Sequence, residues 1–154
     1  MLSRLFCVID TQNVSAAYLP SIMDHLKNNV GRISTGRAYM DLAAPNQDWV
    51  EQSISHGIDP IGVYCHPRKN SVDHYLVSDV YMSREKFDGL VLISNDSDFR
   101  KLALDIKPHA PTYLYCRKSS PRDLIKSFDS VFFYDHLEGA YDNTCHRNKK
   151  RKRE

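Results

Sequence analysis

The chain has 154 residues, of which 42% are hydrophobic and 26% are charged, and these values are typical of one soluble domain with a single core. Its apolar runs are only about five residues long, whereas a membrane-spanning helix needs roughly 20 apolar residues, so we predict no membrane span. The formal net charge of +2 is unevenly distributed: residues 147–154 hold six basic residues and one acid, and the rest of the chain holds 15 basic and 18 acidic residues, a net charge of −3.

Short β-rich runs alternate with longer amphipathic stretches along the chain. Strands are predicted over residues 4–10, 36–41, 60–65, 89–94, 112–116 and 130–134. Helices are predicted near residues 16–29, 46–56, 71–85, 97–106 and 121–128. This repeated strand–helix–strand order indicates an α/β fold in which helices cover both faces of a mostly parallel sheet of five to six strands.

The two ends of the chain bear on where the protein is expected to act. The first nine residues lack the charged and long apolar segments of a signal peptide, so we expect a cytoplasmic protein. Residues 143–154 form a basic tail that we expect to be disordered, because its charges are too concentrated to pack. The same tail can act as a nuclear address if the host has a nucleus.

Acidic residues follow the ends of two predicted strands. Asp10 ends the first strand in FCVIDTQN, and Asp96 and Asp98 follow the fourth strand in LVLISNDSDF. In an open parallel sheet, functional groups gather outside the carboxyl ends of the strands, and the first and fourth strands are commonly neighbours where the strand order reverses. We therefore predict that Asp10 and Asp96 face each other.

A third acid, Asp73, lies in the first turn of the predicted helix over residues 71–85. Asp73 shares the apolar face of this helix with the residues three, four and seven positions later, which are Leu76, Val77 and Val80. Two interpretations are open here: a carboxylate stabilised by the helix dipole, or a functional group directed at the site of the other acids. Its inward direction favours the second.

Carboxylates that share one cleft need a positive partner, because two of them about 4 Å apart repel by roughly 4 kcal/mol at an effective dielectric of 20. Protons, a lysine or arginine, or a hard cation would serve, and Mg²⁺ or Mn²⁺ suits oxygen ligands. Zinc is a weaker alternative. It would use Cys65–His66 and Cys145–His146, pairs of adjacent residues that rarely point at one metal, and the cysteines are otherwise expected to be reduced thiols, mostly buried.

Three stretches, VIDTQN, RKNSVDHYLVSDVYM and LVLISNDSDFRKLAL, followed by SSPRDLIKSFDSVFFY, resemble the NYN domain, a branch of the PIN-like metal-dependent ribonucleases, over roughly residues 4–138. The resemblance implies a PIN-like three-layer α/β/α fold and a nuclease domain over residues 1–142. It implies catalytic roles for Asp10, Asp73, Asp96 and Asn13, and metal ligation by Asp10, Asp73, Asp96 and Asp98. Asp79 matches a recurrent acid of the family, but it lies about 120° round the helix from Asp73, which favours a structural role.

Two positions depart from the family pattern. Thr11 stands where the family often has glycine after the first acid, and we expect its side chain to narrow the cleft. Asn95 stands where the family often has glycine before the third acid. This second change is expected to be mild, because asparagine tolerates left-handed backbone better than most residues.

Basic and aromatic residues near the predicted site are candidates for substrate contacts. The basic candidates, for which surface solvation is the alternative, are Arg68, Lys69, Arg117 and Lys118, together with Lys149, Lys150, Arg151, Lys152 and Arg153 of the tail. His66, His74 and Tyr18 are candidates for stacking on unpaired bases, although packing is favoured for the tyrosine.

The leading functional prediction is a Mg²⁺- or Mn²⁺-dependent ribonuclease acting on single-stranded or flexible RNA. The first alternative is a catalytically weak or inactive NYN-fold module that binds RNA or regulates a partner, and the second is a small phosphomonoesterase. No Walker loop, G-x-S-x-G motif or glycine-rich dinucleotide fingerprint occurs, and this absence argues against other enzyme classes. Whether the chain forms homo-oligomers is left open.

Overall fold

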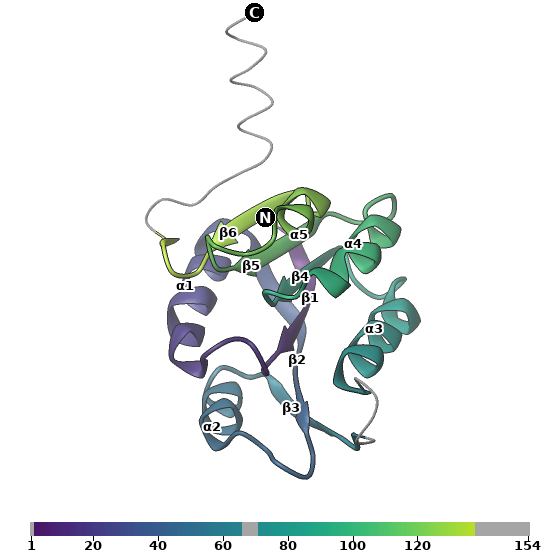
Figure 1. Cartoon of the computed structure of the whole chain (residues 1–154). Helices are drawn as coiled ribbons and strands as arrows, with labels where there is room; N and C mark the ends of the chain where they lie inside the picture. The colour runs from purple at the N-terminus through teal and green to yellow at the C-terminus, as the bar shows by residue number, and fades with distance from the viewer. Residues whose placement is uncertain (1, 66–70, 138–154) are drawn as a thin grey trace, which may run out of the picture.

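Six parallel strands form one sheet, in the order β3-β2-β1-β4-β5-β6, in the computed structural model, which describes residues 2–65 and 71–137 (Figure 1). The strands are β1 (Leu2–Asp10), β2 (Gly31–Asp41), β3 (Asp59–Val63), β4 (Gly89–Ile93), β5 (Thr112–Cys116) and β6 (Ser130–Phe133). The helices are α1 (Leu19–Asn29), α2 (Gln47–Ser55), α3 (Ser71–Ser83), α4 (Arg100–Ile106) and α5 (Arg122–Ser127), with 3₁₀ turns η1 (Ala16–Tyr18) and η2 (Ser97–Phe99). The predicted α/β fold is confirmed, and the sheet in this part of the chain is wholly parallel.

The central strands are apolar on both sides because helices cover both faces of the sheet. In β1, Leu5, Cys7 and Ile9 pack with residues of α1 and α2. The alternate residues, Phe6 and Val8, pack with residues of α3 and α4. Figure 1 shows α1 and α2 on one side of the sheet and α3 and α4 on the other. The two-residue period of a strand then directs the next side chain, at the end of β1, toward α3.

β1 lies inside the sheet and pairs with both β2 and β4. Asp10 pairs with Tyr39 of β2, and the residue before it, Ile9, pairs with Ile93 at the end of β4. The predicted neighbourhood of the first and fourth strands is therefore confirmed. It brings the residues that follow β4 next to the carboxyl end of β1.

Helix α3 is tied to β2 by a partly buried polar network around Asp79. This carboxylate accepts hydrogen bonds from Arg37 Nη1 at 3.1 Å and from the Tyr39 hydroxyl at 2.7 Å. Burial and the adjacent Asp79 charge raise the pKa of Tyr39, so the phenol stays a donor. Asp79 thus fixes α3 against the sheet, in agreement with its expected structural role.

The largest error in the predicted boundaries is at the start of β2. β2 begins at Gly31, five residues before the predicted strand. The turn-forming residues of GRISTG disfavour a strand, but this segment nevertheless pairs with β1, with shifts in the pairing register. A Cβ added at Gly36 would lie 3.0 Å from Ile58 Cγ1, so this glycine allows a close approach inside the strand. The predicted helices over residues 16–29 and 97–106 have the predicted bounds, but each begins with a 3₁₀ turn.

The helices are short, and the longest in the described ranges, α3, has 13 residues. None of these helices has the length and apolar character that crossing a bilayer requires. Among the cysteines, Cys7 and Cys116 are buried free thiols, whose pKa burial raises to about 12, and Cys65 is half-buried. The proposed zinc pairs cannot be followed further, since His66, Cys145 and His146 lie outside the described residues.

The single tryptophan anchors the loop that follows β1. Trp49 of α2 is fully buried, and its Nε1 donates to the carbonyl of Val14 at 2.8 Å. Trp49→Phe would leave this carbonyl without its donor and remove ring volume, so we expect the free energy of unfolding to fall by about 2–3 kcal/mol. Urea denaturation followed by circular dichroism measures the change.

The matched control for this variant is Ile54→Ala in the same helix, because the Ile54 side chain is exposed. This control should change the free energy of unfolding by less than about 0.5 kcal/mol. A similarly small effect of Trp49→Phe would mean that the indole does not hold the loop.

Candidate metal centre

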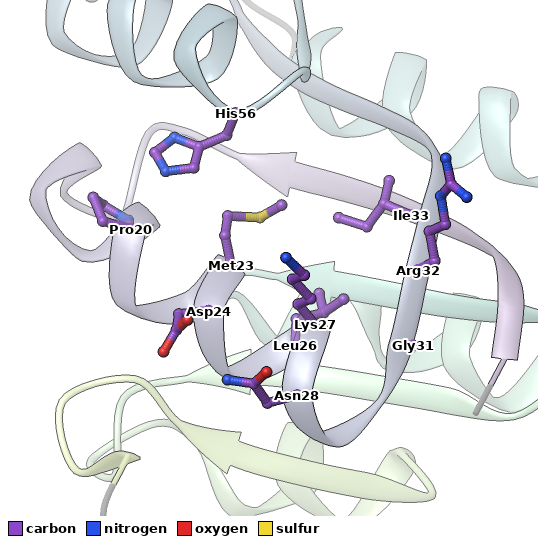
Figure 2. Close-up of a pocket in the computed structure, with 10 residues that line it drawn as sticks. All are labelled: Pro20, Met23, Asp24, Leu26, Lys27, Asn28, Gly31, Arg32, Ile33 and His56. Atoms are coloured by element: carbon purple, nitrogen blue, oxygen red, sulfur yellow. The ribbon is translucent and has the colours of Figure 1, made fainter.

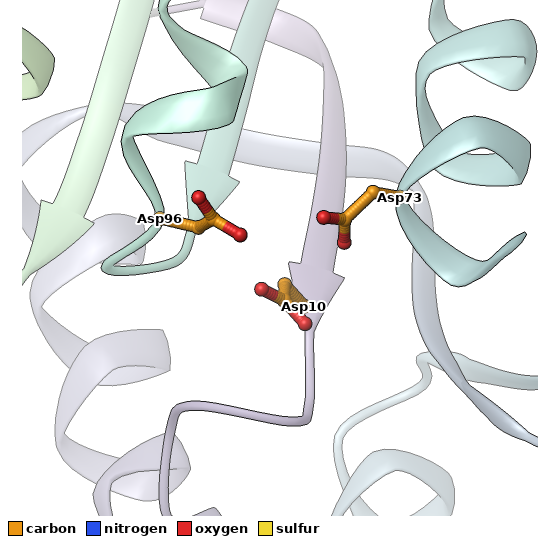
Figure 3. A group of neighbouring side chains, drawn as sticks. All are labelled: Asp10, Asp73 and Asp96. Carbon is orange, nitrogen blue, oxygen red and sulfur yellow. The ribbon is translucent and has the colours of Figure 1, made fainter. Parts of the chain in front are cut away.

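Three carboxylates converge at the carboxyl end of the sheet. Asp10 ends β1, Asp73 lies in the first turn of α3, and Asp96 follows β4. One oxygen from each of these carboxylates lies within 4.8 Å of the others, and Figure 3 shows the three side chains pointing toward one another. Asp10 and Asp73 are buried, and Asp96 is half-buried. The predicted approach of Asp10 to Asp96 is observed, and Asp73 joins them.

Ser94 holds two of the three acids together. Its buried hydroxyl donates to Asp10 Oδ2 at 3.1 Å and accepts from the backbone N–H of Asp96 at 3.1 Å. The other oxygen of Asp10 accepts from the N–H of Gln12 at 3.2 Å. The sequence prediction did not single out Ser94, although a hydroxyl that ends the apolar run LVLIS was a usable signal.

The local electrostatics resist ionisation of Asp10. Burial is the main cause that raises the pKa of Asp10, and the Asp96 charge raises it further. The Gln12 N–H, the Ser94 hydroxyl and the Asn13 side chain lower the same pKa, but they offset only part of the rise. A cation between the acids would favour the ionised carboxylate.

The donor set fits Mg²⁺ or Mn²⁺. It consists of carboxylate oxygens, which these hard ions prefer, and it contains no sulfur or imidazole ligand of the kind zinc commonly takes. Magnesium–oxygen distances are about 2.0–2.1 Å, so opposite ligands of one ion lie about 4 Å apart. The three oxygens lie within 4.8 Å of one another, which is close to this spacing, so a small side-chain movement would bring all three within bonding distance of one ion.

Asp98 lies apart from the three converging acids. Its side chain is exposed on η2, and its backbone N–H donates to Asp96 Oδ1 at 2.9 Å, so Asp96 caps this turn. Asn13 is also exposed, and its carbonyl accepts from Asn95 Nδ2 at 2.9 Å. The metal role of Asp98 and the catalytic role of Asn13 stay predictions.

The two departures from the family pattern, Thr11 and Asn95, each form side-chain hydrogen bonds to neighbouring segments, and the expected narrowing of the cleft by Thr11 stays a prediction. The buried Thr11 hydroxyl donates to the carbonyl of Tyr39 at 2.8 Å, so its polar end is directed to β2. Asn95 does not use left-handed backbone, because no residue other than glycine has a positive φ in the described ranges. Its side-chain amide bonds to neighbouring loops instead.

The predicted substrate contacts fall into two groups. Arg117 and Lys118 follow β5 at the edge of the sheet that carries the acids, and both are exposed. Arg117 lines a cavity of about 440 Å³ together with Asp96 and Asn13. The remaining basic candidates and His66 lie outside the described residues; these are Arg68, Lys69, Lys149, Lys150, Arg151, Lys152 and Arg153.

The two aromatic candidates in the described ranges differ. His74 is exposed on α3, so it remains available for a base. Tyr18 is half-buried, and its ring packs on Tyr134 with the centroids 4.7 Å apart. This contact agrees with the packing role that was favoured for Tyr18.

A larger cavity, of about 1010 Å³, lies between α1, the start of β2 and the end of α2 (Figure 2). Its lining includes Gly31 and Ile33, which begin β2, and His56, which follows α2. The cavity therefore opens at the amino end of β2, whereas the acids lie at the carboxyl ends of the strands. None of the three acids lines it.

Comparisons with known proteins agree with this architecture. The sequence profile of the NYN domain matches residues 4–138. No curated protein matches the sequence. Among solved structures, a Vibrio parahaemolyticus protein of unknown function superposes with a TM-score of 0.67 and 16% identity, over 84% of this chain and 91% of that chain. This likeness shows the fold alone.

A second solved structure, glycinamide ribonucleotide transformylase 1 from Symbiobacterium toebii, has a TM-score of 0.41 and 13% identity, over 85% of this chain and 50% of that chain, a likeness too low to carry an argument. The NYN profile, in contrast, spans almost the whole described chain, and NYN domains have a PIN-like, nuclease-type fold. The resemblance seen in the sequence motifs is thereby confirmed, and the chain belongs to the NYN domain family.

Proposed function

We propose that this protein is a divalent-metal-dependent ribonuclease that hydrolyses phosphodiester bonds in single-stranded or flexible RNA. The observation that carries the proposal is the convergence of Asp10, Asp73 and Asp96, whose oxygens lie within 4.8 Å of one another at the carboxyl end of the sheet. Membership of the NYN family supports it. The family alone does not determine the substrate, so RNA and the metal are the parts to be tested.

Asp10, Asp73 and Asp96 would hold a Mg²⁺ or Mn²⁺ ion. When bound, such an ion polarises the phosphodiester, lowers the pKa of the attacking water and stabilises charge on the leaving oxygen. The hydroxyl of Ser94 and the N–H of Gln12 keep the Asp10 carboxylate oriented. Asn13 is proposed to position the loop after β1 and the attacking water, and no covalent nucleophile from the chain is required.

Basic side chains would bring the RNA to this edge. Arg117 and Lys118 follow β5 beside the acids, and Arg68 and Lys69 precede α3 in sequence. These contacts matter because the chain outside residues 147–154 has a net charge of −3 and would otherwise repel a polyanion. Phosphate contacts of this kind supply affinity and position but little sequence specificity.

The decisive experiment is a cleavage assay on a mixture of structured and unstructured RNAs, with Mg²⁺, Mn²⁺ or EDTA. We expect loss of the unstructured RNA with either metal and none with EDTA. An Asp73→Asn sample purified in the same way controls for contaminating nuclease. Binding of RNA without metal-dependent cleavage would instead assign an RNA-binding role, and preference for nitrophenyl phosphate over RNA would assign a phosphomonoesterase.

The basic tail is predicted to strengthen RNA binding without taking part in cleavage. Each phosphate contact with single-stranded nucleic acid contributes about 0.7 to the slope of log affinity against log salt. If four of the six basic residues in residues 147–154 contact phosphate, deleting this segment should flatten the slope by about 3. Fluorescence anisotropy at several salt concentrations measures the slope, while cleavage at saturating RNA should be nearly unchanged. An unaltered slope would leave the tail as a solvated or targeting segment.

A further inference from the structure

The cavity beside the metal centre has one acidic wall and one basic wall. Asp96 and Ser97 line it from the loop after β4, and Arg117, Ser119, Ser120 and Pro121 line it from the loop after β5. Its volume of about 440 Å³ lies in the range of small-ligand pockets, roughly 300–1,000 Å³, and leaves room for one nucleotide. The cavity therefore adjoins the acids directly, through Asp96.

Arg117 supplies the positive charge in the lining of this cavity. The guanidinium is exposed, its Nε donates to the Tyr134 hydroxyl at 3.3 Å, and it forms no ion pair with any carboxylate of the described residues. A planar guanidinium suits phosphate oxygens, and the hydroxyls of Ser119 and Ser120 can bond to phosphate or to a ribose hydroxyl. Without Arg117 the Asp96 charge would oppose a phosphate here.

Asn95 determines where this arginine lies. Its Oδ1 accepts from the backbone N–H of Arg117 at 2.7 Å and from the Ser120 hydroxyl at 3.0 Å. Its Nδ2 donates to the Asn13 carbonyl at 2.9 Å and to the Tyr134 hydroxyl at 2.8 Å. An asparagine side chain has two donor hydrogens and two acceptor lone pairs, so all of its hydrogen-bonding capacity is used.

These four bonds connect separate parts of the chain at the site. The residue next to Asp96 is joined to the loop after β1, to the loop after β5 and to the residue that follows β6. A glycine at this position would supply none of them. Beyond the pairing of β4 with β5, the Asn95 amide therefore joins the Arg117 backbone directly to the residue next to Asp96.

We propose that the cavity is a subsite for one nucleotide of the RNA strand beside the bond that is cut, with Arg117 binding its phosphate and Asn95 acting as the positioning residue for Arg117. This proposal rests on the proposed ribonuclease function. It adds that one nucleotide beside the cut bond binds in this cavity. The proposal is argued from one juxtaposition: the Asn95 amide, whose four hydrogen bonds are all formed, lies beside the exposed Arg117.

Arg117→Ala tests the phosphate contact. The probe is a fluorescein-labelled oligouridylate of about ten nucleotides, and binding is measured by anisotropy in the Asp73→Asn background, where cleavage is absent. We expect about tenfold weaker binding, because a charge-assisted hydrogen bond to phosphate is lost, and a salt slope flatter by about 0.7. Arg84→Ala, at an exposed arginine after α3, should change neither quantity. An Arg117→Ala protein with unchanged affinity and slope overturns the subsite.

A double-mutant cycle tests the positioning role of Asn95. Asn95→Gly should weaken binding about tenfold when Arg117 is present and less than about twofold in the Arg117→Ala protein, because the lost contact is already missing there. Equal losses in both backgrounds would mean that Asn95 acts on the fold in general, which overturns the positioning role. Thermal melting shows whether the variants stay folded.

If Asn95→Gly does not fold, Asn95→Ala replaces it in the cycle, since it removes the same four hydrogen bonds without adding the backbone freedom of glycine. A loss that depends on Arg117 supports the inference, and an equal loss in both backgrounds overturns it.

The wild-type protein distinguishes failure of the nucleotide subsite from failure of the ribonuclease function. Cleavage by the wild type with no effect of Arg117→Ala rejects the subsite alone, whereas a wild type that neither binds nor cuts RNA rejects the ribonuclease and the subsite together.

Discussion

Asp96→Asn is expected to abolish RNA cleavage, with a loss of at least about 1,000-fold, or about 4 kcal/mol of transition-state stabilisation, while the fold is retained. The substitution removes one charge from the three converging carboxylates. An asparagine can still cap η2 by accepting from the N–H of Asp98, so the local turn should survive. The same loss is expected for Asp73→Asn, and a milder one for Asp98→Asn, whose side chain is exposed and lies outside the three.

Single-turnover cleavage of a labelled unstructured RNA measures these losses, and circular dichroism and thermal melting check the fold. Less like-charge repulsion should leave the Asp73 and Asp96 variants as stable as the wild type or slightly more stable. Asp59→Asn is the matched control, because this exposed acid begins β3 at the opposite end of the sheet. Full activity of the Asp96 variant would remove Asp96 from the site.

Mn²⁺ or Mg²⁺ is expected to raise the melting temperature of the protein by about 5–10 °C at a hundredfold excess over its dissociation constant. Binding to the folded state alone stabilises by about 2.7 kcal/mol at this excess, and 1 kcal/mol corresponds to about 2–4 °C for a chain of this size. Burial and the Asp96 charge raise the pKa of Asp10 in the metal-free protein, so a proton competes with the metal there and the dissociation constant should fall as the pH rises. Differential scanning calorimetry with and without metal measures the shift.

The control for metal binding is the triple variant Asp10→Asn, Asp73→Asn and Asp96→Asn. It should melt at the same temperature with and without metal, and in the absence of metal it should melt no lower than the wild type, because the repulsion is gone. A wild-type protein that shows no shift with either ion at millimolar concentration would count against the metal centre.

The positions of the acids could be predicted because each rests on a regular periodicity or on topology. Asp10 and Asp96 follow apolar strands of a parallel sheet, and the carboxyl ends of parallel strands all lie on the same side of the sheet. Asp73 has the helical spacing of an apolar face, which directs it inward. None of these inferences needs a side-chain rotamer.

The hydrogen-bond partners of the site could not be predicted, because they join residues far apart in the sequence. The Ser94 hydroxyl meets Asp10 across 84 positions, and the Asn95 amide meets Asn13 across 82. Local propensity carries no information on such contacts. It also misled at the start of β2, where pairing with β1 outweighs the turn preference of GRISTG.

The interior place of β1 has a consequence for the timing of assembly. β1 is synthesised before the other strands of the sheet, yet one of its two edges stays unpaired until β4 has been synthesised. Because this pairing closes a long loop, its entropy cost is incurred late in folding. The same event joins Asp10 to Ser94 and brings in Asp96. A nascent chain that ends before β4 therefore exposes an apolar strand edge and lacks one of the three acids. Under the proposed function, the growing polypeptide cannot cut the messenger that encodes it until most of its domain has been made.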